Sequence, residues 1–143
     1  KNLKVAEISN DPPMNIINVL KNNEIIRVEG MDIDLPTYLT KLENKNYNFG
    51  IRASEIRLSD RGEDFQVELA EISGSETLLH LKRGNIKIIV LIEEVMNFKI
   101  HENVKVEFDK NKFYAFSDDG NLIFSPYGVN NGKNWFIKYF PHV

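Results

Sequence analysis

The chain has 143 residues, of which 42% are hydrophobic and 27% are charged, and it contains no cysteine. This length suits one domain with its own core, and the composition is globular, which excludes disordered and fibrous classes. The net charge of −3 argues against a general nucleic-acid binder, and the missing cysteines and signal-peptide pattern favour a reducing cytoplasm. Because the sequence begins with Lys1 rather than Met, we expect a piece of a longer chain.

The amino end predicts a helix end followed by a linker. Val5 and Ile8 stand three residues apart, and Pro12-Pro13 cannot continue a helix. We therefore assign residues 1–15 to the end of a preceding helix and a linker, residues 16–123 to a folded domain, and residues 124–143 to a tail. A second, short helix is predicted within Leu35 to Asn46, where three leucines follow a helical spacing.

Alternating apolar residues predict half-buried strands along most of the chain, as at Ile26 and Val28, Phe49 and Ile51, Val67 and Leu69, and Val104 to Phe108. The continuous apolar run Ile86 to Ile92 predicts a central strand buried on both faces. Turn signals separate the strands, and many short strands at this spacing predict an all-β small barrel or sandwich. The turn signals are Gly30, Asp60-Arg61-Gly62, Gly74, Arg83-Gly84-Asn85 and Asp118-Asp119-Gly120.

The chain offers few constellations that could carry chemistry, and we predict no metal, no cofactor and no catalytic residue in it. His80, His101 and His142 have no partner at metal-ligand spacing. Ser75 with His80 lacks a nucleophile-elbow sequence, so we do not expect a hydrolase.

Three further motifs are better explained as structure. The segment 128–134, "GVNNGKN", has three residues between its glycines where a phosphate loop needs four, and Asn134 where that loop needs Ser or Thr. Asp118-Asp119-Gly120 lacks the glutamate of a calcium loop and predicts a hairpin turn. Neighbouring Glu93 and Glu94 would point to opposite faces of a strand, so they cannot act as a convergent acid and base.

Four segments, at residues 2–17, 49–56, 67–81 and 104–123, share a pattern with one known family. Together they resemble the ATPase subunits of maltose-type ABC sugar importers. "NLKVAEISNDPPMNII" (2–17) is similar to the junction after the nucleotide-binding domain, and "FGIRASEI" (49–56) to a Gly-Ile-Arg-Pro-Glu strand kept at Gly50, Ile51 and Arg52. "VELAEISGSETLLHL" (67–81) and "VKVEFDKNKFYAFSDDGNLI" (104–123) resemble a Gly-Ser-Glu-Thr segment and a closing hairpin. The chain departs from the pattern at Ala53-Ser54-Glu55, and Phe124 to Val143 match nothing in it.

The resemblance implies the transport-associated OB domain, abbreviated TOBE, an OB-fold-like small barrel carried carboxyl-terminal to the ATPase. It implies a regulatory domain that joins two ATPase subunits, with permease subunits as further partners, a regulatory protein as another, and a location at the inner face of the membrane. No Walker A, signature or Walker B sequence occurs here, so ATP and magnesium are expected to bind an upstream part.

Two other functions remain as alternatives. A free-standing OB module would bind single-stranded nucleic acid or oligosaccharide, and Tyr114, Phe116 and Phe124 could supply its rings, although the lysines are spread among acids. A small-oxyanion sensor of the molybdate type would need a Ser-Ala-Arg-Asn strand opening that the chain lacks.

The sequence suggests two roles, a turn and a partner contact, for the segment Gly74-Ser75-Glu76-Thr77. Gly74 supplies the backbone freedom of a sharp turn, and the polar residues return the chain to the strand Leu78 to Leu81. We predict a turn first, and the family resemblance adds a partner-contact role for these four residues.

Overall fold

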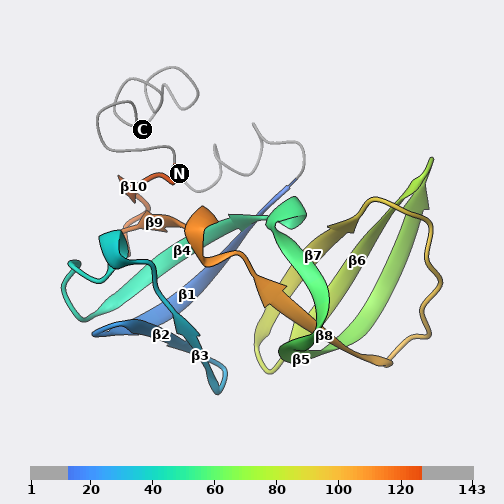
Figure 1. The fold of residues 1–143 in the computed structure, drawn as a ribbon, viewed down its shortest axis with the longest axis horizontal. Coiled ribbons are helices and arrows are strands. Elements are labelled where there is room, and N and C mark those ends of the chain that lie inside the picture. The colour runs from blue at the N-terminus through green and yellow to red at the C-terminus, as the bar shows by residue number, and fades with distance from the viewer. Residues whose placement is uncertain (1–12, 127–143) are drawn as a thin grey trace.

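The computed structural model describes residues 13–126, which form an all-β, OB-like fold of two antiparallel sheets (Figure 1). The first sheet has the strand order β10-β9-β4-β1-β2-β3 and the second the order β7-β6-β5-β8. The fold class predicted from the sequence is confirmed. The strands are β1 (Met14–Asn22), β2 (Ile25–Val28), β3 (Met31–Asp34), β4 (Asn46–Arg52), β5 (Ile56–Ser73), β6 (Glu76–Arg83), β7 (Ile86–Ile92), β8 (Asn103–Phe108), β9 (Tyr114–Phe116) and β10 (Leu122–Phe124).

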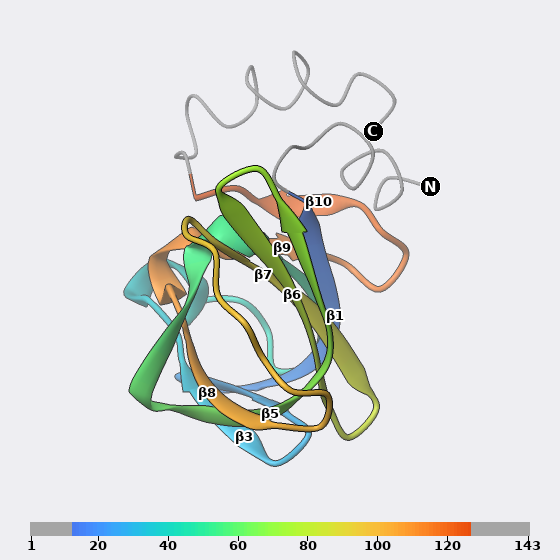
Figure 2. The ribbon, with the colours of Figure 1, turned by 90° about the vertical axis from the view of Figure 1, so that its right-hand side faces the viewer.

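Both sheets curve around one apolar interior (Figure 2). Ile26, Phe49 and Ile51 enter it from the first sheet, and Val67 and Val106 enter it from the second. These residues are the alternating positions that the sequence predicted, because every second side chain of a strand faces the same side. No helix in the described part is long and apolar enough to span a membrane.

The predicted pattern fails at Leu69, which is 46% exposed although Val67 is fully buried. Val67 pairs with Leu81 and Leu69 with the neighbouring His80, so β5 contains one extra residue, Glu68, at this point. A bulge of this kind shifts the alternation by one residue, which moves Leu69 to the outer face.

The prediction of a central strand at Ile86 to Ile92 is wrong, because β7 lies at the edge of its sheet. Only Ile88 and Val90 are buried in this strand. Its free edge is covered by the side chain of Asn15 on β1: the Asn15 amide donates to the Ile89 carbonyl at 2.8 Å and accepts from the Ile89 amide at 2.7 Å. One side chain thus supplies the pairing that a neighbouring strand would supply.

The turn predicted at Asp60-Arg61-Gly62 is also wrong, because these residues lie inside the 18-residue strand β5. Leu58 and Glu63 both pair with Val106 of β8, so the residues between them bulge out of the ladder. A β-carbon on Gly62 would lie 2.2 Å from the Val106 carbonyl oxygen. The glycine is therefore needed for close backbone approach within the strand.

The other predicted turns are confirmed. Gly30, Gly74, Gly84 and Gly120 all have positive φ, the region that glycine adopts without steric cost. Gly120 lies in the turn between β9 and β10, which is the hairpin predicted from Asp118-Asp119-Gly120.

The helical segments are short, and the first and last strands lie near the two ends of the predicted domain. The helix predicted within Leu35 to Asn46 is a single 3₁₀ turn, η1 (Thr37–Leu39), and two further turns are η2 (Ala53–Glu55) and η3 (Lys110–Lys112). β1 begins at Met14 and β10 ends at Phe124, compared with the predicted 16–123. The helix end expected at Lys1 to Ile8 and the tail after Pro126 lie outside the described residues.

Candidate functional site

The segment Gly74 to Thr77 forms the end of the β5–β6 hairpin. Ser73 pairs with Glu76, so Gly74 and Ser75 make a two-residue turn, with φ of +61° at Gly74. Gly74, Ser75 and Glu76 are exposed, as a contact role requires. Thr77 is fully buried instead: its hydroxyl donates to the Glu94 carbonyl at 2.9 Å and accepts from the Met96 amide at 3.0 Å. Thr77 therefore fixes the segment after β7.

The structure does not assemble a hydrolase from Ser75 and His80. His80 lies on β6 and its Nε2 is 2.7 Å from a Glu71 carboxylate oxygen on β5, whereas Ser75 lies in the turn beyond that pair. His101 lies in the loop before β8, where its backbone amide donates to the Val67 carbonyl. Within residues 13–126 no three metal-ligating side chains gather in one place, and His142 lies outside this range.

Of the acidic motifs, the one at Asp119 has a structural role. Asp119 accepts hydrogen bonds from the Ser117 hydroxyl and the Asn121 amide, and these bonds lower the pKa of its carboxyl below the usual value. Glu93 and Glu94 follow the end of β7 and are exposed. The turn at Asp119 is thus held by its own side chains, as expected of a hairpin and not of a calcium loop.

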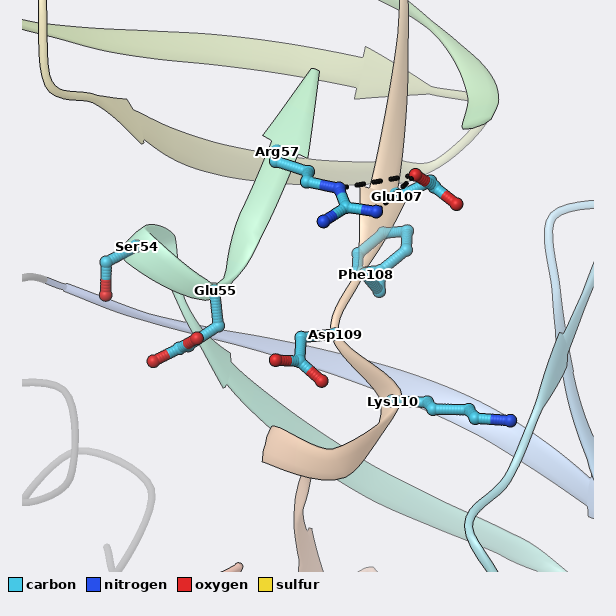
Figure 3. Close-up of a pocket in the computed structure, with 7 residues that line it drawn as sticks. All are labelled: Ser54, Glu55, Arg57, Glu107, Phe108, Asp109 and Lys110. Atoms are coloured by element: carbon cyan, nitrogen blue, oxygen red, sulfur yellow. Dashed lines mark hydrogen bonds and ion pairs between the residues drawn. The ribbon is translucent and has the colours of Figure 1, made fainter. Parts of the chain in front are cut away.

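A pocket lies where β5 begins and β8 ends, and it has a volume of about 510 Å³ (Figure 3). We call it the corner pocket. The backbone amide of Asp109 donates to the Glu55 carbonyl at 3.0 Å, which holds the two walls together. Its lining residues are Ser54, Glu55, Arg57, Glu107, Phe108, Asp109 and Lys110.

One ion pair occupies the rim of the corner pocket. Arg57 and Glu107 are directly opposite on β5 and β8, and their side chains meet at 3.0 Å (Figure 3). Hydrogen bonds from Ser59 and then from Arg57 lower the pKa of the Glu107 carboxyl. Both partners reach solvent, so the pair adds little to stability.

The remaining charges of the corner pocket have both signs. The Glu55 and Asp109 carboxylates lie on one side of it, and the Lys110 ammonium extends away from them (Figure 3). Such a mixed lining can hold a small polar molecule, but it does not bring a nucleophile and a base together. Sequence reasoning missed this pocket because its two segments, 54–57 and 107–110, are about fifty residues apart.

The aromatic residues considered for nucleic-acid stacking are not available to bases. Tyr114 and Phe116 are each 2% exposed, since their strand lies inside the first sheet. Phe124 stacks on Tyr38 with a centroid distance of 4.4 Å. A stacking platform needs open ring faces, so these three residues do not form one.

The chain was compared with protein families and with known proteins. No family model matches the sequence. The chain is similar to the multiple sugar-binding transport ATP-binding protein MsmK of Streptococcus mutans, with 28% identity over 127 aligned residues. The alignment covers 78% of this chain and 34% of MsmK, so the chain spans about a third of the relative's length.

Proposed function

We propose that this chain is the carboxyl-terminal accessory and regulatory domain of the ATP-binding subunit of a carbohydrate ABC importer. The observation that carries the proposal is the similarity to MsmK over 78% of the chain, in a fold of the expected all-β, OB-like class. The share of MsmK that is covered, 34%, fits one domain of a larger ATP-binding protein. The ATP chemistry then belongs to another part of that protein.

The residues that carry the resemblance have clear roles in the fold, which supports a shared domain type. A β-carbon on Gly50 would lie 2.7 Å from the Met14 sulfur, so the Met14 side chain packs closely over this glycine of β4. Arg52 extends over the Tyr114 ring at 5.6 Å, joining β4 to β9. Asn15 holds the edge of β7.

The proposed mechanism is a lasting contact between two copies of the domain. When two ATPase subunits are joined at this end, each nucleotide-binding domain stays near its partner at an effective concentration of roughly millimolar. The subunits can then separate and meet again in every transport cycle without leaving the complex. In this setting the permease subunits are further partners, a regulatory protein can dock on the accessory domain, and the complex works at the cytoplasmic face of the membrane.

The proposal predicts that the isolated chain does not bind ATP. We expect isothermal titration calorimetry of residues 1–143 with Mg-ATP to give no binding heat up to about millimolar ATP, a weak-affinity range. The streptococcal relative, an ATP-binding protein by name, is the positive control. Micromolar binding of ATP by this chain alone would contradict the proposal that ATP binds to another part of the protein.

The proposal also predicts weak self-association. Because the rest of the ATPase is missing, we expect a two-fold dimer with a dissociation constant of roughly micromolar to millimolar, measured by analytical ultracentrifugation over a wide concentration range. A chain that begins at Pro13 is the control for residues 1–12. If both chains stay monomeric at about millimolar concentration, the dimer-holding role is wrong. If only the longer chain dimerises, the contact belongs to residues 1–12 and not to the barrel.

A further inference from the structure

The end of the second sheet that contains the β5–β6 turn is exposed. We call this region the acidic arm, and it consists of residues 69–79 of the β5–β6 hairpin and residues 91–96 at the end of β7. The end of β5 projects at the upper right of Figure 1. The register places Ile72 opposite Thr77, and Thr77 opposite Ile92. The three strand ends therefore lie side by side, and Thr77 holds residues 94 and 96 against them.

Large apolar side chains are exposed on both faces of the acidic arm. Ile72 is 49% exposed on the face that it shares with Thr77. The Thr77 hydroxyl binds the backbone of residues 94 and 96, on either side of Val95, which is 52% exposed. On the opposite face Leu69 is 46% exposed. An antiparallel sheet that ends in solvent normally places polar residues at such positions, and an apolar cluster with a polar rim is typical of a contact surface.

The rim of the acidic arm carries only negatively charged side chains. Glu71, Glu76, Glu93 and Glu94 are exposed there, and neither 69–79 nor 91–96 contains a lysine or arginine. Glu71 is paired with His80, whereas Glu76, Glu93 and Glu94 form no ion pair with any residue in the described range 13–126. A bound partner with positive charge would neutralise these carboxylates at the edge of an apolar contact.

We propose that the acidic arm is the docking surface for a basic, amphipathic segment of another protein, with lysine or arginine for the rim and apolar side chains for Ile72 and Val95. A second copy that presents its own arm does not fit, because two acidic arms would place like charges together at the contact. An anionic membrane surface would be repelled for the same reason. The inference names the partner chemistry of the contact role in the proposed function and rests on that function for its biological setting.

The test uses two synthetic peptides as probes, one alternating lysine with leucine and one with every leucine replaced by serine. We expect the lysine–leucine peptide to bind residues 1–143 in fluorescence anisotropy more tightly than the lysine–serine peptide, with affinity that falls as salt rises. The triple variant E76Q/E93Q/E94Q should weaken binding about tenfold, and so should I72S/V95S.

Matched variants elsewhere on the surface make the result specific. The triple variant E24Q/D60N/D118N removes the same number of charges from exposed acids outside the arm, and L20S/I123S removes two exposed apolar side chains. We expect both to bind the peptide within about twofold of the native chain, because surface substitutions away from a contact have small effects. Urea unfolding of every variant checks that the fold is kept.

Two outcomes would overturn the inference. Equal losses in the arm variants and the matched variants would mean non-specific attraction to an acidic protein. A shift of the monomer–dimer equilibrium by the arm variants, without a change in peptide binding, would assign the arm to a second copy instead. Neither result depends on ATP binding or on the transporter, so failure here is distinct from failure of the proposed function.

Discussion

Replacing Gly62 by alanine should lower the free energy of unfolding by about 3–5 kcal/mol, the range of severe single substitutions. The added β-carbon would lie 2.2 Å from the Val106 carbonyl oxygen and 2.3 Å from its carbonyl carbon. Backbone atoms cannot rotate away as a side chain can, and Val106 is held in pairs with both Leu58 and Glu63. We expect urea unfolding followed by circular dichroism to show a lower midpoint, or expression to yield no folded chain.

Gly74→Ala is the matched control for Gly62→Ala. A β-carbon at Gly74 has open space within 4 Å, so only the φ of +61° opposes the substitution. That strain costs about 1 kcal/mol for a non-glycine residue. A Gly62→Ala chain as stable as the Gly74→Ala chain would contradict the bulge that we describe in β5.

The second large effect is expected for Asn15→Ala, which should lower the free energy of unfolding by about 2–4 kcal/mol. Asn15 is 7% exposed, and its removal leaves both the amide and the carbonyl of Ile89 without their partner. Hydrogen–deuterium exchange gives a more local measurement: the Ile89 amide should lose protection.

Asn18→Ala provides the comparison for Asn15→Ala. Asn18 lies on the same strand, but its bond to Asn48 is exposed and 3.2 Å long. We expect a change below about 0.5 kcal/mol. If the two variants unfold alike, or if the Ile89 amide stays protected in Asn15→Ala, the covering of the β7 edge by Asn15 is not important to stability.

The alternation of apolar residues predicted the fold class and the buried faces because it depends only on local geometry. Gly74 and Asp118 to Gly120 were recognised as turns for the same reason. The predictions fail where contacts between segments distant in the sequence determine the structure. Gly62 has the sequence context of a turn, but it is a glycine because the backbone of Val106 on β8 passes close to it. The run Ile86 to Ile92 has the composition of a central strand, but it lies at a sheet edge that the side chain of Asn15 covers.

The candidate sites also fall into two groups, those that local sequence indicates and those that distant segments form together. The exposed turn at Gly74 to Glu76 could be found from the sequence, whereas burial of the adjacent Thr77 depends on the segment after β7. The corner pocket and the acidic arm join segments that only the sheet register brings together. Lys21 is a further case: it is 1% exposed, and its ammonium donates to Asn23 and Asn44 in a way that no local pattern indicates.

The acidic arm and the proposed dimer contact must occupy different parts of the domain. Like charges prevent two arms from facing each other, so the dimer surface should lie elsewhere on the barrel. Both surfaces could then be used at once, with a partner bound at the arm while two copies remain joined. Arm variants should accordingly leave the ultracentrifugation profile unchanged.

The central claim, that this domain belongs to a sugar-importer ATPase subunit, is tested most directly by reading the coding sequence that precedes the codon of Lys1. We expect one continuous reading frame with a phosphate-binding loop of the form Gly-X-X-X-X-Gly-Lys-Ser/Thr about two hundred residues upstream, the motif whose backbone amides hold the nucleotide phosphates. A stop codon directly upstream, or a preceding domain without that loop, would contradict the account.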